Sequence, residues 1–175
     1  MKGIVIVLVL IIVLGIGGFL FFQNSGSENP LTTSQSNQTT SNASEPRMIE
    51  GYQGEVLAGE ATPYIVFHQA DYEKAIADGK VILVNFYANW CPICRAEQSE
   101  IFEGFEDLNL SNVVGFQVNF KDDQTDDDEQ VLADQFQIPY QHTKVILVDG
   151  QEVFKETVQW ERKDVLETLS RYANQ

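Results

Sequence analysis

The feature that most constrains this chain is a short apolar segment that leads into a pair of cysteines. Residues 81–88 read Val-Ile-Leu-Val-Asn-Phe-Tyr-Ala, and Asn-Trp-Cys-Pro-Ile-Cys follows over residues 89–94. A short apolar run rich in branched side chains is typical of a strand that is buried on both faces of a sheet. The sequence therefore predicts a central strand, with the cysteines at the turn between this strand and a helix.

Cys91 and Cys94 are the only cysteines of the chain, and two residues separate them. The N-terminus of a helix offers unpaired N–H groups and the positive end of the helix dipole, which stabilise a thiolate. Pro92 suits the first helical position, because no N–H group is needed there and the fixed φ of proline fits. We expect Cys91 at the exposed start of the helix and Cys94 one turn inward, close enough to form a disulfide.

The cysteine pair has two other interpretations besides a redox centre. A structural zinc site usually takes four ligands, and the two histidines, His68 and His142, lie far from the pair in the sequence. An inert structural disulfide is disfavoured, because a bridge across so short a loop stabilises a fold only slightly. The spacing and its position after a strand favour a thiol–disulfide redox centre.

The segment from Lys80 to Arg95 resembles the second core strand and the active-site turn of the thioredoxin superfamily. Residues 143–153 are similar to the late β-hairpin of that family, and the resemblance extends from about Tyr64 to the C-terminus. The Trp-Cys-x-x-Cys core carries it. The most similar subgroup is the membrane-associated, extracytoplasmic one, which includes cytochrome-maturation thioredoxins and the periplasmic domain of the thiol:disulfide interchange protein.

The resemblance implies a role for each residue of the turn. Cys91 attacks a substrate disulfide, Cys94 resolves the mixed disulfide, and the same pair run in reverse oxidises substrate thiols. Trp90 shields the site, and Pro92 with Ile93 tunes its potential. No cofactor and no metal is implied. The expected partners are protein thiols or disulfides and a further redox protein of the membrane.

Two positions depart from the usual pattern of the family, and the first lies in the central strand. Thioredoxins usually carry a buried aspartate there, and the matching residue is Asn85, whose amide does not accept a proton. Glu97, three residues after Cys94, is a candidate substitute from an adjacent helical position. The alternative is that Glu97 is an exposed helix carboxylate without a role in the site.

The second departure concerns the cis-proline that the family places at the start of its late hairpin. Taking Thr143 as the threonine of the family puts His142 at the proline position, and Pro139 lies three residues too early unless a short insertion restores it. Histidine offers a hydrogen-bond donor and a metal ligand, which proline does not. We expect His142 beside the cysteines; the alternative is a partly exposed loop histidine without contact to sulfur.

The first third of the chain has a different character. Residues 1–22 are predicted to be a signal anchor, since the apolar run at 3–22 has the roughly 20 residues that span a bilayer. A cleaved signal peptide is the alternative, but its apolar core is usually shorter and ends at a small-x-small site. Residues 23–59 are predicted to be a flexible polar linker, in which 47–59 is either a small hairpin or more tether. Residues 60–175 then form a thioredoxin-like domain outside the cytoplasm, on a single-pass membrane protein.

The formal net charge of −15 argues against nucleic acid or anionic lipid as a partner. Six acidic residues fall within 122–129, where the glycine and the terminal glutamate of an EF-hand loop are missing. This segment is therefore expected to be a solvated loop that runs into a helix start, where carboxylates favour the dipole.

The periodicity predicts an α/β protein with a mixed central sheet and helices on both faces, in the order βαβαβαββα. This order agrees with the thioredoxin fold. The expected strands are 64–68, 81–88, 113–120, 143–148 and 152–157, and the expected helices are 71–78, 92–105, 126–136 and 163–172. Two other functions stay open, namely a non-catalytic thioredoxin-like binding domain and a metal-handling protein that uses Cys91, Cys94 and His142.

Overall fold

The computed structural model describes residues 46–175. The apolar run at residues 3–22, proposed above as a membrane anchor, lies outside the described residues. Within residues 46–175, no helix is both long and apolar enough to cross a membrane.

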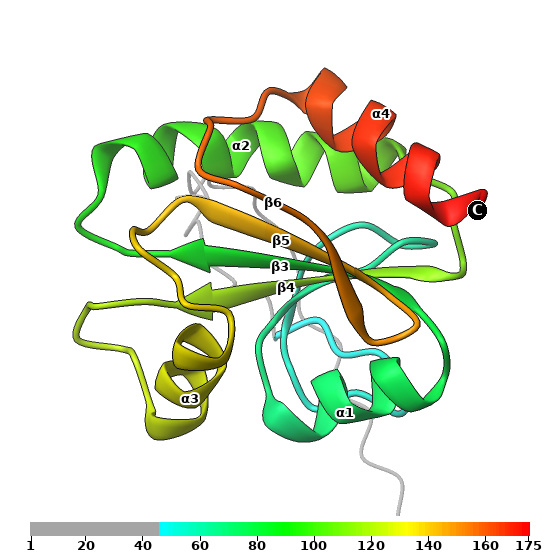
Figure 1. Cartoon of the computed structure of the whole chain (residues 1–175). Coiled ribbons are helices and arrows are strands. Elements are labelled where there is room, and N and C mark those ends of the chain that lie inside the picture. The colour runs from blue at the N-terminus through cyan, green and yellow to red at the C-terminus, as the bar shows by residue number, and fades with distance from the viewer. Residues whose placement is uncertain (1–45) are drawn as a thin grey trace, which may run out of the picture. The chain divides into compact units, whose positions relative to one another are not determined.

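Six strands form one mixed sheet in the order β1-β2-β4-β3-β5-β6 (Figure 1). β3 (Val81–Tyr87) lies between β4 (Val113–Asn119), to which it is parallel, and β5 (Thr143–Val148), to which it is antiparallel. All residues of β3 except the last are buried, which confirms the predicted central strand. The remaining strands are β1 (Val56–Ala58), β2 (Tyr64–Val66) and β6 (Gln151–Glu156).

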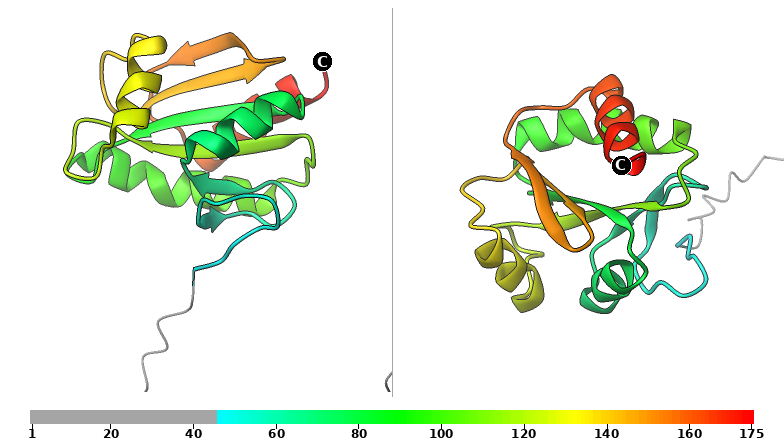
Figure 2. Two further views of the ribbon diagram at one scale, coloured as in Figure 1. Left: turned by 90° about the horizontal axis from the view of Figure 1, so that it is seen from below. Right: turned by 45° about the vertical axis from the view of Figure 1, so that its right-hand side comes forward.

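Four helices cover the two faces of this sheet (Figures 1 and 2). α2 (Pro92–Asp107) and α4 (Arg162–Ala173) lie on one face. α1 (Gln69–Ala77) and α3 (Asp127–Gln135) lie on the other face. The helices start and end within a few residues of the predicted positions, so the layered α/β architecture expected from the periodicity is confirmed.

The pleat of β3 sends alternate side chains into the two layers. Ile82, Val84 and Phe86 belong to the hydrophobic cluster that includes residues of α1 and α3. Val81 and Leu83 belong to the cluster that includes residues of α2 and α4. A strand that supplies both cores must be apolar throughout, which explains its continuous hydrophobic sequence.

The ordered domain begins before residue 60, so the predicted linker boundary at residue 59 is corrected. β1 lies inside that segment and pairs antiparallel with β2, which follows it. The Asp71 carboxylate of α1 accepts the backbone N–H groups of Gln53 and Gly54, at 2.9 and 2.8 Å. Residues 47–59 are therefore not simply more tether: they supply the first strand of a small hairpin at the sheet edge, and the second strand, β2, lies beyond residue 59.

Candidate active site

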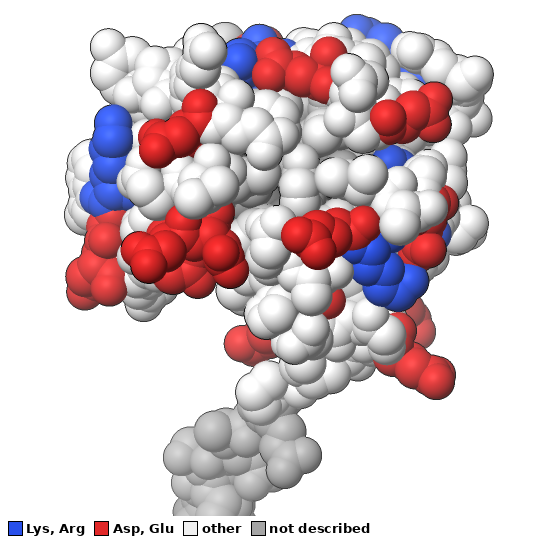
Figure 3. All heavy atoms as spheres, turned by 60° about the horizontal axis from the view of Figure 1, so that its bottom comes forward, with Lys and Arg blue, Asp and Glu red and all other residues white. Residues whose placement is uncertain are grey.

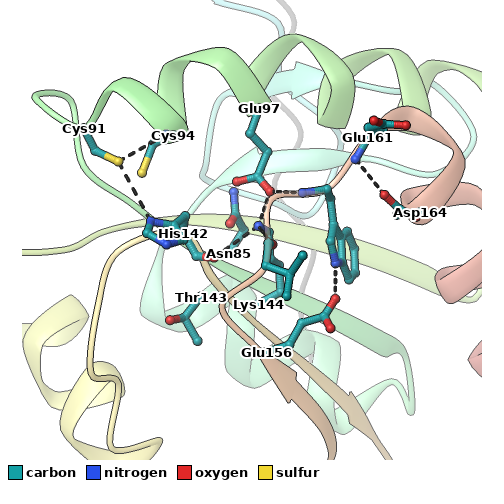
Figure 4. Close-up of polar contacts among 12 residues, drawn as sticks. Asn85, Cys91, Cys94, Glu97, His142, Thr143, Lys144, Glu156, Glu161 and Asp164 are labelled. Carbon is teal, nitrogen blue, oxygen red and sulfur yellow. Dashed lines mark hydrogen bonds and ion pairs between the residues drawn. The ribbon is translucent and has the colours of Figure 1, made fainter.

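The cysteine pair lies where the loop after β3 enters α2, as the sequence predicts. Cys91 is the N-cap residue of α2, and Pro92 is the first helical residue. The Cys91 sulfur accepts the backbone N–H of Cys94 at 3.2 Å (Figure 4). This sulfur occupies the place of the oxygen in a usual N-cap, where a free N–H group and the helix dipole favour negative charge.

Burial does not distinguish the two cysteines, which corrects the expectation of an exposed Cys91. Both are free thiols, and the exposed fraction is 2% for Cys91 and 3% for Cys94. What differs is the setting of the sulfur. Burial, together with the hydrogen bond to Cys91, raises the pKa of Cys94 to about 12. Cys94 therefore keeps its proton at neutral pH, while Cys91 receives the N–H bond that stabilises a thiolate.

The residues beside the cysteines form a partly apolar rim. Trp90 is 52% exposed and Ile93 is 43% exposed, and Pro92 is exposed as well. The Trp90 indole N–H donates to the backbone carbonyl of Lys121 at 2.9 Å, which ties this ring to the loop after β4. The supporting roles of these three residues remain predictions, but their side chains are available to a partner.

A network of polar contacts that the sequence analysis did not identify holds the active-site turn. The backbone N–H of Asn89 donates to the Asp122 carboxylate at 2.9 Å, and the Asn89 amide donates to Asp123 at 2.6 Å. Arg95 donates to the Asn89 carbonyl at 2.9 Å. Part of the acidic segment therefore fastens the turn, and the rest begins α3, where Asp126 and Glu129 form a capping box. The chain position of Asn89 next to the cysteines was the only available signal.

Asn85 is buried in the sheet on the strand that leads to the site. Its amide donates to the Tyr64 hydroxyl at 2.9 Å. Its carbonyl oxygen is buried and has no hydrogen-bond partner among the described residues. Asn85 is thus a structural contact of β3 with β2, and it offers the cysteines no proton acceptor.

Glu97 is almost completely buried, so the alternative of an exposed helix carboxylate is wrong. Its carboxylate forms an ion pair with Lys144 and accepts the backbone N–H of Trp160 (Figure 4). Burial raises the pKa of Glu97 and lowers that of Lys144, and their mutual attraction opposes both shifts. Sequence reasoning missed Lys144, because a single lysine within a strand is usually solvent-exposed.

His142 lies beside the cysteines, as the alignment predicted. Its Nδ1 atom is 4.0 Å from the Cys91 sulfur. The ligand atoms of Cys91, Cys94 and His142 all lie within 4.8 Å of one another. Burial, and then the charge of Lys144, lowers the pKa of His142, so the imidazole is neutral near pH 7. Pro139 is exposed.

Comparisons with known proteins agree with this site and fold. The family model "Thioredoxin" matches residues 63–171. The thiol:disulfide interchange protein DsbE of Yersinia pestis is 33% identical over 93 residues, which cover 48% of this chain and 44% of that protein. DsbE of Escherichia coli K12 is 37% identical over 57 residues, covering 33% of this chain and 27% of that protein. This chain thus spans less than half the length of these interchange proteins.

Thioredoxins themselves are covered more fully. A thioredoxin H-type of Fagopyrum esculentum is 32% identical over 95 residues, which cover 54% of this chain and 73% of that protein. The structure of a mutant thioredoxin from Halobacterium salinarum NRC-1 superposes with a TM-score of 0.50 at 24% identity, over 66% of this chain and 96% of that one. The structure shares the thioredoxin fold, and with the family match over more than half of its length, the chain belongs to the thioredoxin family.

Proposed function

We propose that this protein is a thiol–disulfide oxidoreductase in which Cys91 is the attacking nucleophile and Cys94 the resolving thiol. The observation that carries the proposal is the asymmetry at the start of α2. The Cys91 sulfur receives the Cys94 N–H at 3.2 Å, and the pKa of Cys94 is raised to about 12. A thiolate is the reactive form in disulfide exchange, so the chain favours Cys91 for the first step.

The reaction follows from these positions. The Cys91 thiolate attacks a disulfide of a partner protein, and one partner sulfur leaves as a thiolate. Cys94 then gives its proton to the partner thiolate that has left and attacks the Cys91 sulfur, which releases the second partner sulfur as a thiolate. After the reaction, this protein holds a Cys91–Cys94 disulfide, and the partner has gained two electrons. The reverse sequence oxidises a dithiol.

The surface around the site suits a protein partner better than a nucleic acid. Trp90 and Ile93 expose apolar area next to the sulfurs. Acidic side chains lie in several groups over the face shown in Figure 3, and the formal net charge of the chain is −15. Phosphate backbones would be repelled by such a surface.

We further propose that the domain acts outside the cytoplasm, tethered to the membrane by residues 3–22. The support is the apolar run of this segment and the polar composition of residues 23–45 that follow it. A redox protein in this position would exchange electrons with protein thiols and with a second redox protein of the membrane. Protease added to intact spheroplasts should remove the domain; a protected domain would contradict the tethered topology.

The exchange reaction is tested with the full chain and two serine variants. Wild-type protein should accelerate the reduction of insulin disulfides by dithiothreitol, and Cys91→Ser should reduce the rate to background. Cys94→Ser should accumulate a mixed disulfide at Cys91, visible by mass spectrometry, because the resolving thiol is missing. Full activity of Cys91→Ser would overturn Cys91 as the nucleophile, and a wild-type chain that gives no acceleration would indicate a domain that binds partners without catalysing exchange.

A further inference from the structure

The loop before β5 holds His142 in a conformation that the backbone does not adopt without support. His142 has φ 54°, in the left-handed region that non-glycine residues rarely occupy. Its N–H donates to the Phe86 carbonyl at 2.6 Å, and its carbonyl accepts the buried Lys144 ammonium at 3.1 Å. Contacts on both sides of the residue therefore fix its backbone. Backbone strain that is supported in this way is typical of functional positions.

This conformation directs the imidazole to the cysteines. In Figure 4 the two cysteine side chains extend from the start of α2 toward the His142 ring, which lies below them in this view. The Nδ1 atom is 4.0 Å from the Cys91 sulfur, and the three ligand atoms lie within 4.8 Å of one another. In a tetrahedral zinc site, bonds of about 2.3 Å to sulfur and about 2.0–2.1 Å to nitrogen separate these atoms by about 3.6 Å. The Nδ1 atom and the Cys91 sulfur, at 4.0 Å, are therefore a few tenths of an ångström from ligand geometry, and the most widely spaced pair, within 4.8 Å, closes by up to about 1.2 Å when the ion binds.

We propose that the reduced chain binds one zinc ion through the sulfurs of Cys91 and Cys94 and the imidazole of His142. Two sulfurs and one imidazole are the ligand types that zinc prefers in proteins. Two thiolates neutralise the charge of Zn²⁺, so the site carries no net charge in its buried surroundings. Among the described residues, no carboxylate joins this group of ligands.

Three protein ligands leave the fourth position of a tetrahedral ion open. Water or the thiolate of a partner protein can take that position, and Trp90 and Ile93 expose apolar surface beside the cysteines. A structural zinc site has four protein ligands and no open position. The proposed site has three, so it is not a site of that kind. An open position makes the ion exchangeable.

Zinc binding and disulfide formation exclude each other, because both use the same two sulfurs. Binding releases two protons from the thiols and moves no electrons. A disulfide of a partner that reacts with the zinc-bound form takes two electrons, becomes two thiolates, and leaves a Cys91–Cys94 disulfide and a free zinc ion. The oxidised chain therefore has no zinc site, and zinc slows alkylation of Cys91 in the reduced chain.

The experiment uses the full chain in mild detergent, reduced with a phosphine, and Co²⁺ and Zn²⁺ as probes. Equimolar Co²⁺ should give thiolate-to-cobalt charge-transfer absorption and the visible bands of tetrahedral cobalt, and Zn²⁺ should remove both. Because Cys91 and Cys94 are the only cysteines, this absorption reports on the proposed site alone. Chain oxidised to the disulfide should show neither signal.

Variants separate the role of His142 from that of the dithiol. His142→Asn keeps a residue type that tolerates the left-handed conformation and removes the imidazole. Its zinc affinity should be at least about tenfold weaker, since even the loss of a supporting residue around a metal typically costs that much. The matched control is His68→Ala, which removes the only other histidine, an exposed one, and should leave the affinity unchanged.

Two results would overturn the proposal. One is the absence of tetrahedral cobalt absorption in the reduced wild-type chain, and the other is equal zinc affinity of wild type and His142→Asn. The insulin assay on metal-free protein reports separately on disulfide exchange. The zinc site can therefore fail while the proposed oxidoreductase function stands, and the reverse holds as well.

Discussion

Replacing Lys144 by methionine tests how strongly the buried ion pair holds the domain. The Lys144 side chain is fully buried, and its ammonium contacts the Glu97 carboxylate, the Val158 carbonyl at 2.8 Å and the His142 carbonyl at 3.1 Å. Methionine has a similar length but donates no hydrogen bond. The variant leaves the Glu97 carboxylate buried with the backbone N–H of Trp160 as its remaining donor.

The expected cost follows from this uncompensated charge. Breaking a buried ion pair by removing one partner typically costs about 3–5 kcal/mol. This range is a measured total for such substitutions, and it includes the penalty for groups such as the His142 and Val158 carbonyls, which also lose their donor. We therefore expect Lys144→Met to lose about 3–5 kcal/mol of the free energy of unfolding. This is a large share of the total, since domains of this size unfold with about 5–15 kcal/mol.

Urea unfolding of the reduced chain, followed by tryptophan fluorescence, measures this loss. The double variant Glu97→Gln/Lys144→Met removes both charges of the buried pair, and it should be at least about 1 kcal/mol more stable than Lys144→Met. Lys163→Met, an exposed lysine on α4, serves as the matched control and should change stability little. A loss below about 1 kcal/mol for Lys144→Met would refute the reasoning, because it would show that the carboxylate reaches water or takes up a proton when its partner is removed.

Three further predictions concern the thiols, a helix contact and pH. Brief alkylation of the reduced chain at pH 7 should label Cys91 before Cys94, whose pKa is raised to about 12; peptide mass mapping that finds Cys94 labelled first would contradict this. Gly104→Ala should destabilise the domain by about 1–3 kcal/mol in the same unfolding assay, because its new methyl group would lie 2.6 Å from the Val165 Cβ. Burial raises the pKa of Glu129 from 4.5 to about 7, so the folded chain holds this proton more tightly than the unfolded chain. Its contribution to stability should therefore fall by up to about 3 kcal/mol between pH 4.5 and 7, and Glu129→Gln should weaken that slope in urea titrations.

Local patterns were sufficient to predict most of the fold. The apolar run of β3 and the proline after Cys91 depend on residues that are close in sequence, and both features lie where they were expected. The hairpin between β5 and β6 also follows from a local pattern, the Asp-Gly pair at residues 149 and 150. Both residues have the positive φ, 51° and 71°, that a tight turn of this kind requires.

The buried pair could not be predicted in the same way. Glu97 and Lys144 are 47 residues apart, and each in its own element has the sequence context of an exposed side chain. The segment before α4 also contacts the pair: the Trp160 N–H donates to Glu97, and the Lys144 ammonium lies 5.7 Å from the centre of the Trp160 ring. The exposure of the cysteines was misjudged for a related reason, because tertiary contacts around the turn cover a helix start that is usually open to solvent.

The same lysine also explains why residue 142 need not be a proline. The N–H of His142 donates to the Phe86 carbonyl at 2.6 Å, and its φ is 54°. Proline has no N–H and a fixed φ near −65°, so it cannot occupy this conformation. Lys144 supports the other side of the residue by donating to its carbonyl at 3.1 Å. The conformation of this loop therefore needs an N–H group at residue 142. His142→Pro would change the backbone as well as the side chain. For this reason His142→Asn, and not His142→Pro, isolates what the imidazole contributes beside the sulfurs.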